Sequence, residues 1–166
     1  MKNMKEVSMN NNMNLSQHFT LGEVTKTSVK TADGNVPSPE HIENLRNLCE
    51  GWLEELRENY NMIYEGVGDC KGDEPIIINS GYRSPEVNRA VGGSPTSNHL
   101  TGCAVDIRCL GIEQAIRYAC IQLDIADGTK RDFDDLFIER NAKGNYWLHF
   151  AVCPKDNRRR TIFIQT

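Results

Sequence analysis

The sequence predicts an α+β fold in which a small antiparallel sheet is flanked by helices. Residues 39–56 and 112–123 carry apolar side chains at steps of three and four, which is typical of helices that bury one face. Five short segments alternate polar and apolar residues or are rich in β-branched ones, which is typical of strands. At 166 residues and 39% hydrophobic content, the chain is long enough to close one compact core.

Composition excludes several classes of function. The formal net charge is -4, whereas nucleic-acid phosphates call for a basic surface, so we expect no nucleic-acid partner. No apolar run approaches the roughly 20 residues that cross a bilayer, and the Asn-rich start has no signal-peptide core. We therefore expect a protein that is made in the cytoplasm without a signal peptide and has no membrane partner. We also expect a monomer. Without an export signal, the six cysteines are expected to be reduced thiols that fill buried space, and the absence of a C-x-x-C pair argues against a cysteine zinc site or a redox site.

The first part of the chain contains a tail and two helix starts. Residues 1–14 are rich in Asn, Lys and Met without an apolar period, which predicts a mobile tail before a single domain over residues 15–166. The segment 20–23 (TLGE) matches a capping box, so a short helix begins there. Ser38 and the proline after it are a typical N-cap and first-turn pair, and the long helix follows them.

The middle of the chain predicts a strand, a short helix and a loop. Residues 75–79 are mostly apolar and β-branched, which predicts a buried strand with Arg83 just beyond its end. A brief helix starts at Ser84. The glycines and proline of residues 91–95 then break it into a loop that leads to His99.

The next strand and helix complete the first half of the core. Residues 103–109 alternate, so Asp106 points away from the apolar face of its strand. The helix over residues 112–123 packs its apolar stripe inward. Residues 124–135 form a charged connection, in which the acids lack the Gly and Glu of a calcium loop and are expected to be solvated. The acids concerned are Asp132, Asp134 and Asp135.

Three strands end the chain and are expected to form an antiparallel sheet. They span residues 136–140, 146–152 and 161–165, and a turn over residues 141–145 joins the first two. Within the second strand, His149 shares a face with Trp147 and Ala151. The triplet RRR at 158–160 favours an exposed charged turn over a binding surface for an anionic wall.

Three of these residues form a candidate metal site. His99 and Asp106 lie one loop-to-strand step apart, so their side chains can meet at one point. A catalytic zinc takes three protein ligands and leaves one position for water, and imidazole with carboxylate is a suitable donor set. Of the other histidines, His41 belongs to the long helix and His18 lies near the start, whereas His149 lies on a strand of the same sheet. Alternatively, His99 is a loop histidine, Asp106 caps or pairs with Arg108, and His149 is a half-buried strand residue.

Several motifs resemble one family of peptidases. The segments are residues 18–23 (HFTLGE), 80–84 (SGYRS), 97–107 (SNHLTGCAVDI) and 147–149 (WLH), with Asn88 and the VGG of 91–93 between them. They are similar to the zinc D-alanyl-D-alanine metallocarboxypeptidases of metallopeptidase family fifteen, which share their fold with hedgehog signalling domains. The resemblance runs from about residue 16 to residue 153. It implies one zinc ion held by His99, Asp106 and His149.

The resemblance also implies a reaction and a partner. The reaction is hydrolysis of peptide bonds that involve D-amino acids in bacterial peptidoglycan, either the terminal D-Ala-D-Ala bond or a bond within the stem peptide or cross-link. A lone catalytic domain of this kind resembles phage or prophage endolysins, which reach the cell wall by assisted release. The alternative is a non-catalytic module on the hedgehog-like fold, which keeps zinc for structure and binds the cell wall or a protein.

Four further residues are candidates for catalysis and substrate binding. Glu139 resembles the acid that takes a proton from the attacking water, the alternative being a surface acid paired with a neighbouring cation. Several branches of the family instead place the acid three residues before the last ligand, where this chain has Tyr146, which we assign to substrate binding. Arg83 resembles the arginine that holds a substrate carboxylate or carbonyl through its fork of donors. Ser97 either bonds the substrate or a ligand, or caps its loop.

Overall fold

The computed structural model describes residues 10–165, and residues 1–9 and 166 lie outside the described part. The predicted tail over residues 1–14 falls largely on those outside residues, so the tail and the domain boundary stay predictions. At the start of the described part, the backbone carbonyl of Met13 accepts a hydrogen bond from the N–H of Leu21 at 2.8 Å.

The fold is α+β, as the sequence predicts, with one five-stranded sheet and helices around it. In chain order the elements are α1 (Leu21–Thr25), α2 (Pro39–Leu48), the π-helical η1 (Cys49–Leu53), α3 (Glu54–Tyr64), β1 (Ile78–Ser80), α4 (Pro85–Ala90), the 3-10 helix η2 (Asn98–Thr101), β2 (Ala104–Cys109), α5 (Ile112–Thr129), β3 (Asp135–Arg140), β4 (Tyr146–Ala151) and β5 (Arg160–Gln165). The order of strands across the sheet is β1-β2-β4-β3-β5.

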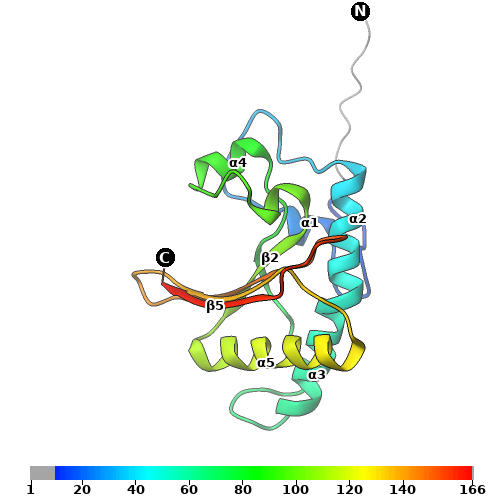
Figure 1. Cartoon of the computed structure of the whole chain (residues 1–166), viewed down its shortest axis with the longest axis vertical. Helices are drawn as coiled ribbons and strands as arrows, with labels where there is room; N and C mark the ends of the chain where they lie inside the picture. Colours follow the sequence, from blue (N-terminus) through cyan, green and yellow to red (C-terminus); the bar gives the residue numbers. More distant parts are fainter. Residues whose placement is uncertain (1–9, 166) are drawn as a thin grey trace, which may run out of the picture.

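The two faces of the sheet have different roles. In Figure 1, α5 lies along one side of the sheet and the α2–η1–α3 rod runs down its flank, whereas α4 lies on the other side. Apolar side chains of β2, β3 and β4 join the helices in one core. Those sheet residues are Val105, Ile107, Cys109, Leu136, Leu148 and Phe150. Alternate positions on the same strands therefore face away from α5 and are available for a site.

The helix starts agree with the sequence. Thr20 and Glu23 form the complete capping box of α1, and the Ser38 side chain accepts a hydrogen bond from the His41 N–H at the start of α2. The predicted long helix continues through α3, but η1 interrupts its α-helical hydrogen bonding over five residues. Leu48, Trp52 and Leu56 are all buried across this segment, so the apolar stripe does not reveal η1.

The last strand, β5, corrects the prediction of a wholly antiparallel sheet. It pairs parallel to β3, with Asp135 opposite Arg160 and Phe137 opposite Ile162. The reason is that β4 lies between β2 and β3, so both of its edges are already paired. After β4 the chain reverses direction, and β5 pairs with the open edge of β3 instead. Because β3 is antiparallel to β4, a strand that runs opposite to β4 is parallel to β3.

Two other boundaries differ from the prediction. Helix α5 continues to Thr129, because Ile125 and Ala126 extend its buried stripe while Asp124 and Asp127 lie outside it. The charged connection is correspondingly shorter. Strand β1 begins at Ile78, and its ladder with β2 contains a register shift between Ile78 and Ser80.

The cysteines are free thiols, and they are less uniformly buried than the sequence suggests. Cys49, Cys70, Cys103 and Cys109 are buried, whereas Cys153 is half-buried and Cys120 is exposed. Within residues 10–165, no helix combines the length and the apolar character needed to cross a membrane.

Candidate metal centre

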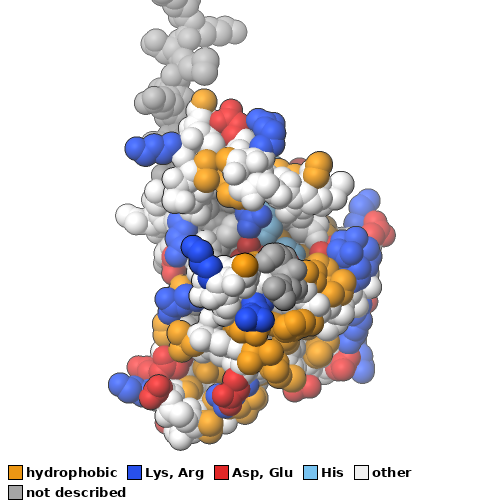
Figure 2. Space-filling view, turned by 90° about the vertical axis from the view of Figure 1, so that its left-hand side faces the viewer, with side chains coloured by type: hydrophobic (Ala, Val, Ile, Leu, Met, Phe, Trp, Pro, Cys, Tyr) orange, Lys and Arg blue, Asp and Glu red, His pale blue; other side chains and the backbone are white. Residues whose placement is uncertain are grey.

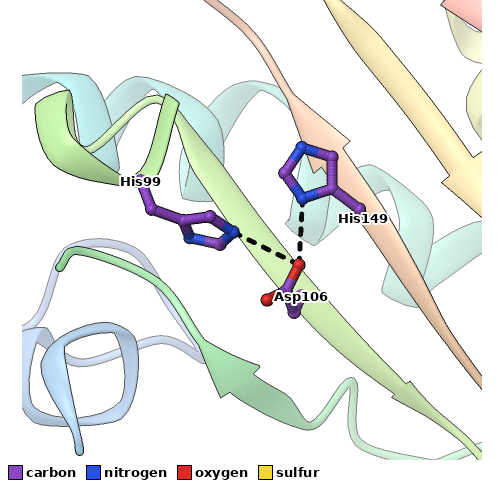
Figure 3. Close-up of side chains that lie close together, drawn as sticks. All are labelled: His99, Asp106 and His149. Atoms are coloured by element: carbon purple, nitrogen blue, oxygen red, sulfur yellow. Dashed lines mark hydrogen bonds and ion pairs between the residues drawn. The ribbon is translucent and has the colours of Figure 1, made fainter. Parts of the chain in front are cut away.

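The three predicted metal ligands meet on the face of the sheet away from α5. Asp106 lies on β2 and His149 lies directly opposite it on β4, as a register pair of the antiparallel ladder. His99 lies on η2, immediately before β2. The sheet therefore places two ligands side by side, and the short helix brings the third over them (Figure 3).

The local sequence explains how η2 holds His99. The Ser97 side chain caps the helix by accepting a hydrogen bond from the His99 N–H at 3.3 Å, so the capping alternative for Ser97 is confirmed. Gly102 ends the helix with φ +71, a conformation that side chains with a Cβ rarely adopt. A Cβ at Gly102 would also lie 2.5 Å from the carbonyl oxygen of His41. Serine, histidine and glycine thus each have a separate structural role in this segment.

One oxygen of Asp106 is shared by both histidines. Its Oδ1 lies 2.9 Å from Nδ1 of His149 and 3.3 Å from Nε2 of His99. One donor atom from each of the three residues lies within 4.8 Å of the other two. With metal bonds of roughly 2.0–2.1 Å, neighbouring ligands of a tetrahedral zinc lie about 3.3 Å apart, which agrees with this spacing.

The far nitrogen of His99 is fixed by the backbone. His99 is buried, and its Nδ1–H donates to the carbonyl oxygen of Gly81 at 2.6 Å. Because Nδ1 carries the proton of this hydrogen bond, Nε2 is the nitrogen that faces Asp106, and loss of the Nε2 proton gives the tautomer that a metal requires. The chemistry of the donor set, two imidazoles and a carboxylate in a buried position, therefore fits zinc.

Electrostatics hold Asp106 in its charged form. Burial alone would raise the pKa of this carboxyl, but the charges and hydrogen bonds of His99 and His149 hold the pKa far below its ordinary value. Despite its burial, the hydrogen bond and charge of Asp106 in turn raise the pKa of His149. The pocket thus balances a buried anion with protons on imidazole, and a metal cation can replace those protons.

Comparison with known proteins identifies the family. Residues 17–122 match the family model described as Peptidase M15, a match that covers more than half of the chain. The chain belongs to the peptidase M15 family. M15 members are zinc peptidases. A search of curated proteins gives no match.

The M15 match contains His99 and Asp106 but ends before β3 and β4, so it assigns no role to His149 or Glu139. The structure alone brings those two side chains to the site. Glu139 and Phe137 share one face of β3, and Phe137 is the register partner of His149. The Phe137 ring stacks on His149 with a centroid distance of 5.5 Å. Glu139 thus lies one position along the same face.

The environment of Glu139 is unusual for an acid near a strand end. Burial and the negative charge of Asp106 raise its pKa, although His149 and the indole of Trp147 act in the opposite direction. The Trp147 Nε1–H donates to Oε2 of Glu139. A half-buried carboxyl with a raised pKa, close to a metal site, is suited to accept and return a proton.

A cleft of about 420 Å³ opens beside His149 in this M15 chain. It is lined on one side by the η2 region, including Ser97 and Asn98, and on the other by β3 and β5, including Glu139 and Arg160. Figure 2 shows histidine atoms in a hollow of this face, next to cationic and acidic side chains. The lining is polar and matches a peptide better than an apolar ligand.

Arg83 and Tyr146 take different positions relative to this centre. The guanidinium of Arg83 donates to Oδ2 of Asp106 at 2.7 Å and to Oγ of Ser80 at 2.9 Å, so the structure brings Arg83 to the centre. Tyr146 lies on the opposite face of β4, where it packs against the core beneath the guanidinium of Arg140. The structure does not bring Tyr146 together with the ligands.

The expectation of solvated aspartates is wrong for two of the three. Asp134 and Asp135 are buried, with 2% and 4% of their surface exposed, whereas Asp132 is exposed. Arg158 donates to both oxygens of Asp134, and Arg160 donates to Asp135 at 2.8 Å. The predicted exposed arginine turn therefore also supplies the partners of two buried acids. The sequence prediction starts this strand at Leu136, one residue too late, and so omits Asp135 from its alternation with Phe137 and Glu139.

Asp134 ties η2 to the sheet, and this predicts a dependence of stability on pH. Hydrogen bonds from Arg158 and Asn98 hold the pKa of Asp134 well below the ordinary 3.8. A depressed pKa means that the stabilisation is complete above about pH 4 and is lost as the pH falls further. We expect Asp134→Asn to lower the melting temperature at pH 7 and to flatten the fall in melting temperature between pH 4 and pH 2. Thermal melts followed by circular dichroism test this, and an equally steep fall in the variant would contradict it.

Proposed function

We propose that this protein is a zinc peptidase that hydrolyses peptide bonds involving D-amino acids in bacterial peptidoglycan. The observation that carries the proposal is the convergence of His99, Asp106 and His149 at one buried point, in a chain of the M15 family. The motif resemblance to D-alanyl-D-alanine carboxypeptidases supports the wall peptide as the substrate class. The substrate bond is either the terminal D-Ala-D-Ala bond or a bond in the stem peptide or cross-link.

The three ligand residues would hold one zinc ion. A bound zinc ion lowers the pKa of water and polarises a carbonyl, which is the chemistry that amide hydrolysis needs. The burial of His99 and Asp106 excludes bulk water from the ligand atoms. Their fixed hydrogen bonds to Gly81 and Arg83 keep the donor atoms in place, so little reorganisation is needed on binding.

Glu139 has the role of general base and acid in this proposal. Its carboxylate takes a proton from the attacking water and returns it to the amine that leaves. Its place beside His149 in the cleft supports this role. The same placement argues against the non-catalytic alternative, because an acid reaches the cleft from β3 even though Tyr146 occupies the position used by other branches.

Arg83 would orient the substrate. Its guanidinium already uses two donors on Asp106 and Ser80, and a guanidinium offers five N–H groups in all. The remaining donors can bind a carboxylate or carbonyl of the peptide, and the positive charge persists at any working pH.

Metal removal tests the proposal directly. We expect the purified chain to contain about one zinc per molecule and to release amino groups from purified peptidoglycan, since a catalytic zinc site of this kind binds one ion. A chelator should abolish the release, and added zinc should restore it. Mass spectrometry of the products then distinguishes free D-alanine from cleaved cross-links. Bound zinc without release from any wall type would favour the binding module, and a metal-free protein under zinc-replete conditions would refute the proposal.

A further inference from the structure

A second carboxylate lies behind His149, on the side of the ring away from Asp106. His149 faces Asp106 with Nδ1, and its Nε2 lies 4.0 Å from Oδ2 of Asp135. Asp135 is opposite Ala151 in the β3–β4 ladder, which makes it the diagonal neighbour of His149 on the same face of the sheet. The imidazole is thus placed between two buried carboxylates.

Asp135 is held firmly on its other side. Arg160 donates through Nε to Oδ1 at 2.8 Å, and its terminal nitrogen lies at the same distance from that oxygen. Asn98 donates to Oδ2 at 3.3 Å. Oδ1 is therefore occupied by the arginine, while Oδ2 keeps room for one more donor on the side that faces His149. The side chain is 6% exposed, so water does not compete freely for that place.

Asp135 is unsuited to be a fourth ligand. It faces Nε2, whereas the atoms that converge at the centre are Nδ1 of His149, Nε2 of His99 and an oxygen of Asp106. A histidine that binds a metal through one nitrogen usually donates its other N–H to a carboxylate, which fixes the ring and its tautomer. Gly81 performs this task for His99 at 2.6 Å, and Asp135 is the carboxylate on the corresponding side of His149, with Oδ2 4.0 Å from Nε2.

We propose that Asp135 is a positioning residue that orients His149 for metal binding, and that Arg160 holds Asp135 in place. This proposal rests on the metal site of the proposed function, but it does not depend on the substrate. It also explains why the arginine turn lies next to the cleft, since Arg160 contacts the buried acid while Arg159 points to Asp127 and Asp132 instead. The sequence signal for this role is an aspartate two residues before Phe137, on the strand that pairs with the strand of His149.

A neighbouring ion pair of the arginine turn at 158–160 offers a matched control. Asp132 and Arg159 form an ion pair at 3.0 Å that is exposed and does not contact His149. The test compares Asp135→Asn with Asp132→Asn, and Arg160→Gln with Arg159→Gln, in the 166-residue chain. Zinc affinity is measured by competition with a coloured chelator, and Co²⁺ is substituted to record the visible spectrum of the centre.

We expect Asp135→Asn to weaken zinc binding by about 10–100-fold, as the loss of a carboxylate partner of a ligand histidine does elsewhere. The Co²⁺ spectrum should change as well, because a less constrained ring alters the ligand field. Arg160→Gln should move both readouts in the same direction by a smaller amount, and it serves as the second variant if Asp135→Asn does not fold. The Asp132 and Arg159 variants should match the unmodified protein.

The outcomes separate this proposal from the proposed function. Tight zinc binding with unchanged affinity and spectrum in Asp135→Asn and Arg160→Gln would overturn the role of Asp135 and leave the peptidase proposal intact. Equal losses in the control variants would also overturn it, because a general effect of the turn would then explain them. Failure of the unmodified chain to bind zinc would overturn both.

Discussion

Replacing His149 with alanine is expected to remove zinc binding and hydrolysis together. His149 supplies one of three ligand atoms, and its Nδ1 lies 2.9 Å from the shared oxygen of Asp106. Without it, two ligands remain, fewer than the three protein ligands that catalytic zinc sites use. We therefore expect zinc affinity to fall by more than the roughly 100-fold that the loss of an outer partner can cost.

The measurement is zinc content by elemental analysis, together with release of amino groups from peptidoglycan. His18→Ala is the matched control, because His18 pairs with Glu54 at 2.7 Å and lies outside the ligand cluster. It should keep both zinc and activity. One zinc per chain in His149→Ala would show that the third ligand is another residue. His149 would then be a half-buried strand histidine without a role in metal binding.

How far the sequence predicts this centre depends on how local each feature is. Ser97, His99 and Gly102 act within one short helix, so their spacing carries the information that places the imidazole. Asp106 follows from the alternation of its own strand. His149 is different, because its position opposite Asp106, 43 residues earlier in the chain, depends on the pairing of β2 with β4. Elimination among the histidines made it the candidate third ligand, its spacing gave only weak support, and the resemblance to a family supported the choice.

The features that the sequence did not predict depend on interactions between distant segments. The parallel pairing of β5 results from the fact that both edges of β4 are already paired. The residues of β5 themselves do not indicate this pairing. Likewise, Asp134 and Asp135 look like solvated acids until the turn that carries Arg158 and Arg160 is folded against them. A buried carboxylate requires a partner, and here the partner comes from about 25 residues later in the chain.

Replacing Glu139 with glutamine should separate metal binding from catalysis. The amide has nearly the same shape and still accepts a hydrogen bond from the Trp147 indole, but it cannot take a proton from water. We expect zinc to remain at one per chain, since Glu139 lies outside the ligand cluster. The turnover number should fall by about 10²–10⁴-fold, the usual contribution of a positioned general base.

Steady-state kinetics on a defined muropeptide, with zinc analysis of the same samples, test this expectation. Glu113→Gln on the exposed side of α5 is the control for the loss of one negative charge, and it should leave turnover unchanged. Full activity in Glu139→Gln would remove Glu139 from the mechanism. Zinc binding would then coexist with a base that is another group in the cleft or on the substrate. A large loss of turnover with zinc retained would instead place the proton transfer on β3, next to the last metal ligand.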